Sequence, residues 1–162
     1  MARIENHVVR EVVSLDETAT LAEAARLMAG RGIGSVGVRC DGKLAGLVTE
    51  RELLAAIARG ADPARTALSA ALQFPPPSVS PTATEREAAE LMRAHHTRHL
   101  AVVERGEMVG VISLLDLVEL VVEEKQWSID QLESYIRGGR AAQLSQPLTT
   151  PFTHAPAGGL AA

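Results

Sequence analysis

The chain repeats itself with a period of 64 residues, and this duplication restricts its fold more than any other feature. Residues 18–28 (TATLAEAARLM) align with residues 82–92 (TATEREAAELM), and residues 46–54 align with residues 110–118. Between residues 14 and 53 the first copy aligns with the second without a gap and is identical to it at 13 of 40 positions. The sequence therefore predicts two equivalent halves, related by a pseudo-twofold axis, that pack against each other.

Each copy shows the same order of elements, β-α-β-β-α. A short extended piece precedes an amphipathic helix, in which Leu21, Leu27 and Met28 fall at helical spacing in the first copy. Thr20 and Thr84 stand where a hydroxyl group can cap the start of this helix. The predicted strands span residues 12–15, 35–39 and 44–48, then 78–80, 100–103 and 108–112, and the second helices span residues 51–59 and 115–124.

Composition argues against several classes of protein. A net charge of −4 gives no electrostatic attraction to nucleic acid or to an anionic membrane, and four aromatic residues are few for base stacking. No apolar run approaches the roughly 18 residues of a membrane span. Because Cys40 is the single cysteine, no disulfide can form within the chain. The charged N-terminus lacks the apolar run of a secretory signal. We expect a cytoplasmic protein that binds neither nucleic acid nor membrane.

One motif stands at the end of the last strand in each copy. It consists of glycine, two apolar residues, a hydroxyl residue, two variable residues and an acid, namely Gly46, Thr49 and Glu52 in GLVTERE and Gly110, Ser113 and Asp116 in GVISLLD. A helix that begins at the hydroxyl residue offers backbone N–H groups and partial positive charge to a phosphate. An acid three residues later lies on the same face and can accept hydrogen bonds from ribose hydroxyls. The spacing suits a ribose phosphate.

The repeat length, the β-α-β-β-α order and this motif resemble the CBS domain family, named after cystathionine β-synthase. The segment RHLAVV (98–103) is also similar to a strand of that family, although Ala101 stands where a proline is common. The resemblance covers residues 8–124. It implies an α+β fold, a tandem CBS-domain pair in which two βαββα repeats are related by pseudo-twofold symmetry.

The resemblance implies a regulatory module, not an enzyme, that needs no cofactor or metal and binds an adenosine compound in clefts between the repeats. AMP, ADP, ATP, NAD and S-adenosylmethionine are the candidate ligands, and the sequence does not choose among them. The implied ligand-binding residues are Thr84, Arg98, His99, Leu100, Ser113 and Asp116 for the second repeat and Thr20, Gly34, Ser35, Thr49 and Glu52 for the first.

The two implied sites differ in sequence. Glu52 is one methylene longer than Asp116, and the first copy has Gly34 and Ser35 where the second has Arg98 and His99. Loss of a charge-assisted hydrogen bond weakens a site by roughly 10- to 150-fold. We therefore expect the site built on Asp116 to be the stronger one.

Simpler interpretations stand beside these. A hydroxyl residue followed three positions later by an acid is also a capping box, so Ser113 with Asp116, and Thr49 with Glu52, can serve the helix start alone. His95 and His99 are four residues apart, as metal ligands often are, but no acid or cysteine joins them. Cys40 fits an incidental thiol better than a redox centre.

The expected organisation is a first repeat (residues 1–64), a linker (65–77), a second repeat (78–126), a helix (127–139) and a disordered tail (140–162). The terminal helix either packs on its own module or docks on a partner. By resemblance two chains form a flat homodimer through helices, where the pairs Ala24–Ala25 and Ala88–Ala89 allow close approach. An unidentified effector protein is the expected partner, and a ligand-free dimeric interaction scaffold is the alternative function.

Overall fold

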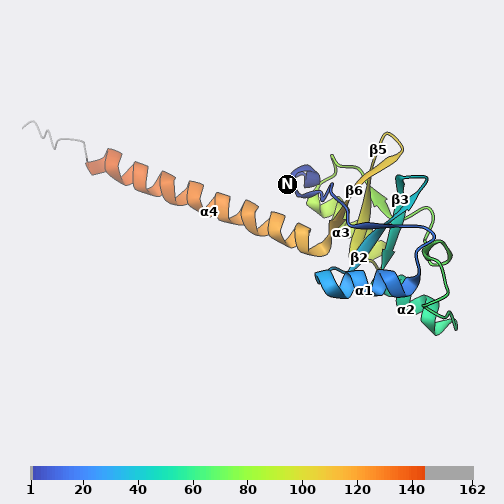
Figure 1. Ribbon diagram of the computed structural model, residues 1–162. Helices are drawn as coiled ribbons and strands as arrows, with labels where there is room; N and C mark the ends of the chain where they lie inside the picture. The colour runs from blue at the N-terminus through green and yellow to red at the C-terminus, as the bar shows by residue number, and fades with distance from the viewer. Residues whose placement is uncertain (1, 145–162) are drawn as a thin grey trace, which may run out of the picture. The chain divides into compact units, whose positions relative to one another are not determined.

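A computed structural model describes residues 2–144, with side chains up to residue 137, and divides into one unit that ends at Glu124 and another that begins at Lys125. The elements in chain order are the 3₁₀ helix η1 (Ile4–His7), β1 (Ser14–Asp16), α1 (Leu21–Arg31), β2 (Ser35–Cys40), β3 (Lys43–Thr49), α2 (Glu50–Ala58), the 3₁₀ helix η2 (Leu68–Ala70), β4 (Ser78–Val79), α3 (Glu85–Ala94), β5 (His99–Glu104), β6 (Glu107–Ser113) and α4 (Leu114–Leu144) (Figure 1). The predicted β-α-β-β-α order occurs in both halves.

The two halves form two equivalent three-stranded sheets, β1-β2-β3 and β4-β5-β6. In each sheet the first strand runs parallel to the middle strand, which pairs antiparallel with the third. A register shift between Val38 and Arg39 recurs 64 residues later between Val102 and Val103. The duplication therefore extends to an irregularity of the sheet, and the α+β tandem pair predicted from the sequence is the observed fold.

Capping boxes begin the first helix of each repeat, as the threonines predicted. The hydroxyl oxygen of Thr20 accepts a hydrogen bond from the amide of Glu23, whose carboxylate accepts one from the amide of Thr20 at 2.6 Å. Thr84 and Glu87 repeat this arrangement, with the amide of Thr84 2.8 Å from the carboxylate. These bonds lower the pKa of both glutamates, the backbone bond contributing most. Both threonine hydroxyls are thus engaged locally.

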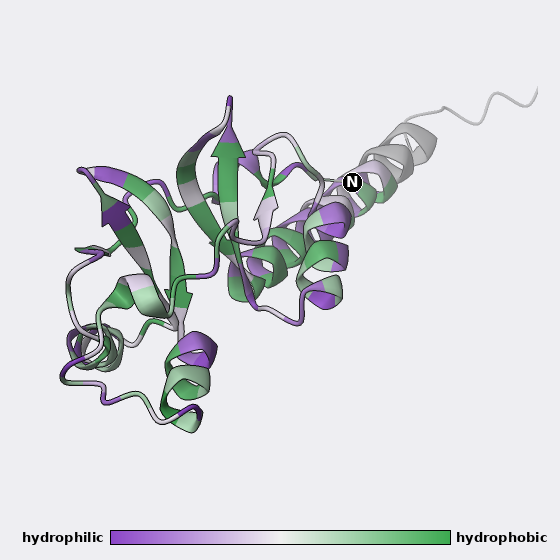
Figure 2. Ribbon diagram, turned by 90° about the vertical axis from the view of Figure 1, so that its right-hand side faces the viewer, coloured by the Kyte–Doolittle hydropathy of each residue, from purple (hydrophilic) through white to green (hydrophobic). Residues whose placement is uncertain are grey.

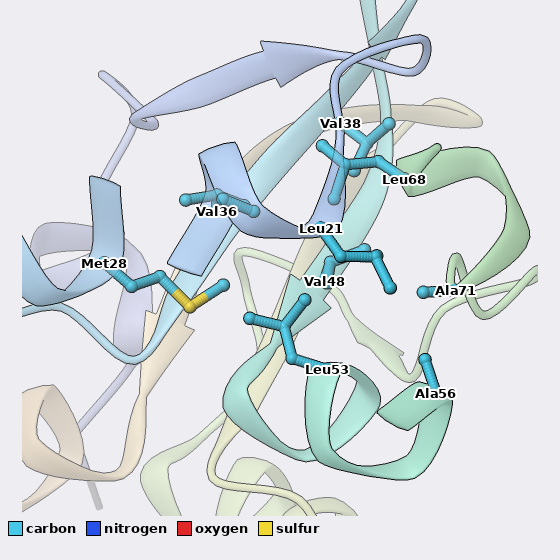
Figure 3. Packing of buried hydrophobic residues seen from close by; sticks show 10 residues of the cluster. Leu21, Met28, Val36, Val38, Val48, Leu53, Ala56, Leu68 and Ala71 are labelled. Carbon is cyan, nitrogen blue, oxygen red and sulfur yellow. The ribbon is translucent and has the colours of Figure 1, made fainter. Parts of the chain in front are cut away.

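Each repeat has its own apolar core. In the first, Leu21 and Met28 of α1 pack with strand residues Val36 and Val48 and with Leu53 of α2 (Figure 3). The second core holds Met92, Leu100, Ile112 and Leu117 at the positions equivalent to Met28, Val36, Val48 and Leu53, and a smaller cluster of Leu47, Ala101 and Val111 joins the two sheets. Hydrophobic colour accordingly runs along much of the strands, whereas the helices carry both hydrophobic and polar colour (Figure 2).

Each core is completed by the segment that precedes the other repeat. Ile4 of η1 is fully buried in the second core, where its amide donates to the carbonyl of Ala83 at 3.0 Å. Leu68 of η2, 64 residues later, is fully buried in the first core, where its amide donates to the carbonyl of Ala19 at 2.8 Å. The expected division, which gave residues 1–64 to the first repeat and 65–77 to a linker, therefore misses this exchange.

The C-terminal helix differs from the expectation. Separate helices were predicted over residues 115–124 and 127–139, but α4 runs without a break from Leu114 to Leu144. No proline or strong turn signal interrupts residues 125–128 (KQWS), and each of Gly138 and Gly139 costs only about 1 kcal/mol within a helix. Residues 140–144, expected in a disordered tail, belong to this helix, and the rest of that predicted tail lies outside the described residues.

Two alanines expected at a dimer contact are interior residues instead. Ala24 and Ala88 are fully buried in the two cores, whereas their neighbours Ala25 and Ala89 are exposed. Met28 and Met92, which occupy equivalent positions of the two helices, are also buried in the cores. Helical spacing turns the first residue of each alanine pair toward its sheet, so those residues contribute to folding of the repeats.

Truncation of Ile4 tests the exchange of segments. Ile4→Ala should lower the free energy of unfolding by about 2–5 kcal/mol, because it leaves a cavity in the second core although the residue lies near the chain start. Val9→Ala is the matched control, since Val9 is half-exposed and bonds to Val111 through its backbone; it should cost under about 1 kcal/mol. Urea denaturation measures both values, and equal losses would contradict the burial of η1 in the second core.

Candidate functional site

The motif of each repeat places a capped helix start at the end of the last strand. Thr49 ends β3, and its hydroxyl oxygen accepts a hydrogen bond from the amide of Arg51 at 3.2 Å, while Glu52 completes a capping box. At the start of α4 the amide and hydroxyl of Ser113 donate to Oδ2 of Asp116 at 2.6 and 2.7 Å. The capping interpretation of both pairs is therefore realised, and these bonds use one oxygen of the Asp116 carboxylate.

A main-chain hydrogen bond repeated in both halves brings the loop before the middle strand to this helix start. The amide of Glu50 donates to the carbonyl of Gly34 at 3.1 Å, and the amide of Leu114 donates to the carbonyl of Arg98 at 2.8 Å. The sheets fix the same geometry, because Ser35 lies opposite Thr49 and His99 opposite Ser113 in strand register. Loop, strand and helix therefore meet at one edge of each sheet.

A cleft of about 380 Å³ lies between the two repeats at this edge. The first repeat lines it with Gly34, Thr49, Glu50 and Arg51, and the second with His96, Thr97, Arg98 and His99. The His99 ring packs closely on Gly34, since a Cβ atom at that position would lie 3.1 Å from its Cε1 atom. Glycine thus provides the room that the histidine occupies.

The cleft brings together four of the residues that the resemblance implied, Gly34, Thr49, Arg98 and His99. These residues were expected in two different sites, but they line the same cleft. Arg98 and His99 were assigned to the Asp116 site, whereas here they face residues of the first repeat. Elsewhere lie Thr20 and Thr84 at the starts of α1 and α3, Ser35 at the start of β2, Glu52, Ser113 and Asp116 in the capping pairs, and Leu100, which is fully buried in the second core.

Four cleft residues were not among the expected ligand-binding residues: Glu50, Arg51, His96 and Thr97. Glu50 and Arg51 are the variable positions of the first motif, which makes them first-turn residues of α2. His96 and Thr97 directly precede Arg98, so their position beside the strand start was available as a signal. The spacing of residues within one repeat could not predict that the motif of the first repeat lies beside the loop of the second.

Charged side chains from both repeats meet in the cleft. The guanidinium of Arg98 forms a salt bridge with the carboxylate of Glu50 at 3.3 Å, and Arg51 donates to the carbonyl of His96. The salt bridge is solvent-exposed, so its contribution is at most about 1 kcal/mol. Burial lowers the pKa of His99, and the adjacent positive charge of Arg98 lowers it further. The cleft therefore presents two arginines, one of them held by an exposed salt bridge, beside a histidine that favours its neutral form.

The described part of the chain shows no arrangement of side chains that could hold a metal ion. Residues 2–144 contain no cluster of three His, Cys, Asp or Glu side chains placed to hold a metal ion. His95 is the residue that ends α3, and it is exposed. Within the same residues, none of the helices combines the length and apolar character that crossing a membrane requires.

The fold and the site define a class of protein: a pair of β-α-β-β-α repeats with a cleft between them. The chain belongs to the CBS-domain family, since the CBS domain model matches residues 4–59 and 70–123. It is 30% identical over 118 residues to the CBS domain-containing protein YhcV of Bacillus subtilis (strain 168), a match that covers 72% of this chain and 84% of YhcV.

Solved structures resemble this chain over most of their length. The CBS-domain containing protein ATU1752 from Agrobacterium tumefaciens is 29% identical with a TM-score of 0.66, over 74% of this chain and 98% of that one. CBSX2, solved in complex with AMP, has a TM-score of 0.65 over 77% of this chain and 99% of its own. Because CBSX2 is only 18% identical, this likeness concerns the fold alone.

Cys40 is held as a thiol. Its Sγ donates to Oε2 of Glu17 at 3.0 Å, and this hydrogen bond, followed by burial and nearby acids, raises the pKa of Cys40 to about 11. Thiols react as thiolates, so Cys40 should react with iodoacetamide at pH 8 at least about tenfold more slowly than free cysteine. Glu17→Gln should accelerate alkylation more than Asp41→Asn, which removes a smaller contribution, and the reverse order would contradict this cause.

The depressed pKa of His99 predicts a pH dependence of stability. Unfolded histidine takes up a proton near pH 6.5, whereas folded His99 resists it, so stability is lost as the pH falls below about 6.5 until the folded pKa is reached. His99→Gln should flatten the decrease between pH 7.5 and 5.5, and His95→Gln, at an exposed position, should leave it intact. Denaturation midpoints at both pH values measure the difference, and equal slopes in wild type and His99→Gln would refute it.

Proposed function

We propose that this CBS pair is a regulatory module, not an enzyme, that binds an adenosine-containing ligand between its repeats and signals to an effector protein or through its dimeric state. The observation that carries the proposal is the cleft lined from both repeats, in which Arg51 and Arg98 stand beside the start of α2. AMP, ADP, ATP, NAD and S-adenosylmethionine are the ligand candidates. The proposed setting is the cytoplasm, with no cofactor required for folding.

The chemistry of the cleft supports a phosphate-bearing ligand. A volume of about 380 Å³ falls within the roughly 300–1,000 Å³ of small-molecule sites. Guanidinium groups bind phosphate oxygens with paired hydrogen bonds, and a helix N-terminus adds partial positive charge. The salt bridge between Arg98 and Glu50 is solvent-exposed, so a phosphate can replace that carboxylate at small cost. CBSX2, which shares this fold, was solved with AMP.

Asp116 remains the proposed ribose ligand of a second site. Its Oδ2 atom accepts the capping bonds of Ser113, which leaves the other carboxylate oxygen to a ribose hydroxyl, and the residue is half-buried. Glu52 is the equivalent acid of the first repeat and is also engaged by its cap. We propose unequal affinities on this basis, with Asp116 in the stronger site.

Removal of one arginine tests the cleft. Arg98→Ala should weaken AMP binding by about 10- to 150-fold, the value of one charge-assisted hydrogen bond. Arg93→Ala is the matched control, because Arg93 is an exposed arginine on α3 that does not line the cleft. Titration calorimetry of wild type and both variants with AMP, ATP, NAD and S-adenosylmethionine gives the affinities.

The same titrations with Asp116→Ala and Glu52→Ala separate the two proposed sites. Loss of one binding event in Asp116→Ala, with a smaller effect of Glu52→Ala, is the expected result. If neither Arg98→Ala nor Asp116→Ala changes the affinity for any of these compounds, the assignment of both residues to ligand-binding sites is wrong.

The engaged capping pairs favour a second candidate, a ligand-free dimeric interaction scaffold, because Ser113, Asp116, Thr49 and Glu52 already satisfy one another. Thermal unfolding with a panel of adenosine compounds distinguishes the two functions. A ligand at 100 times its dissociation constant adds about 2.7 kcal/mol to the free energy of unfolding. A raised melting temperature supports ligand binding, and unchanged melting with every compound supports the scaffold.

A further inference from the structure

Both arginines of the cleft contact an oxygen atom of the opposite repeat. Nη2 of Arg98, from the second repeat, lies 3.3 Å from Oε2 of Glu50 in the first. Arg51, from the first repeat, donates to the carbonyl of His96 in the second. A phosphate that binds in the cleft through either guanidinium therefore has to compete with an oxygen atom of the protein.

The carboxylate of Glu50 lies where the phosphate of a cleft ligand would bind. Glu50 is the first residue of α2, and it lines the cleft together with Arg98. Its carboxylate also lies beside the loop of its own repeat, since a Cβ atom at Gly34 would be 3.8 Å from Cδ of Glu50. A guanidinium binds carboxylate and phosphate oxygens with the same fork of N–H groups. Glu50 therefore engages Arg98 as an internal substitute for an anionic ligand.

The start of α2 is capped without this acid. Its capping box is formed by Thr49 and Glu52. The main-chain bond from Glu50 to Gly34 also forms in the second repeat, where a leucine stands in place of the acid. The other edge lacks the arginine as well, because glycine stands at the position equivalent to Arg98. The acid thus occurs at the edge that has an arginine to engage, which indicates a role in binding at the cleft.

We propose that Glu50 is an autoinhibitory residue, whose carboxylate competes with the phosphate of a ligand for Arg98. This role rests on the proposed binding of a phosphate-bearing adenosine ligand in the cleft. Ligand affinity is reduced in proportion to the fraction of molecules in which Arg98 is free. An exposed ion pair shifts that equilibrium by up to about fivefold. The displaced carboxylate stays on the same helix turn and repels the bound phosphate, which adds to the effect.

Competition of this kind acts on one class of ligand. A phosphate-bearing compound has to displace Glu50 from Arg98, whereas adenosine, which has no phosphate, leaves the pair in place. Glu50 therefore lowers the affinity for nucleotides relative to the nucleoside. Because the two residues belong to different repeats, the same exchange replaces a contact between the repeats with a contact to the ligand.

Calorimetric titrations of wild type and Glu50→Gln with AMP and with adenosine test the competition. AMP should bind Glu50→Gln about 3- to 10-fold more tightly than wild type, because the amide removes both the competing charge and its repulsion. The affinity for adenosine, however low, should be the same in both proteins.

The matched control is Glu90→Gln. Glu90 forms an ion pair with Arg86 at 3.2 Å, and this pair is also exposed but lies on α3, away from the residues that line the cleft. Its removal should leave the affinities for AMP and adenosine unchanged. Without ligand both variants should melt like wild type within a few degrees, since each loses one exposed ion pair.

The same titrations in an Arg98→Ala background identify the group for which Glu50 competes. There the gain in AMP affinity from Glu50→Gln should fall to about twofold or less, because no guanidinium remains to be released. A gain of equal size in both backgrounds would show long-range repulsion instead of competition and would overturn the proposal.

Two further results would contradict the role of Glu50 and leave the proposed function in place. One is an affinity for AMP that Glu50→Gln leaves unchanged or lowers, and the other is an equal gain for adenosine. If no adenosine compound binds either wild type or Glu50→Gln, the proposed function itself is wrong, and the competition fails with it.

Discussion

The two repeats depend on each other because neither closes its core with its own contiguous sequence. Ile4 enters the second core from a segment that precedes the first repeat, and Leu68 enters the first core from the segment between the repeats. A half of about 60 residues buries a smaller fraction of its surface than a larger domain does and is marginally stable by itself, and the exchange supplies each half with a large apolar side chain from outside it. The sheet-to-sheet cluster around Ala101 then needs to fix only the relative position of two completed halves.

The cleft follows from this arrangement, and the divergence between the copies determines its chemistry. Where the first repeat carries Glu50 and Arg51, the equivalent positions of the second are Leu114 and Leu115, and where the second carries Arg98 the first carries Gly34. The backbone is duplicated down to the hydrogen bond between loop and helix. Side chains therefore make the two edges unequal: the cleft receives charges from both repeats, whereas the equivalent motif positions of the second repeat carry two leucines. Symmetry of the fold does not require symmetry of binding.

The sequence predicted local structure well and cross-repeat structure poorly. Identity between the copies predicted the element order, and the capping hydroxyls of Thr20 and Thr84 predicted two helix starts, because these depend on neighbouring residues. The sequence did not predict that η1 and η2 are equivalent. Residues 3–9 and 67–73 have no identical residue at matching positions, although Ile4 and Leu68 are both apolar. The pairing of Arg98 with Glu50 depends on the packing of one repeat on the other, which spacing within a repeat does not contain.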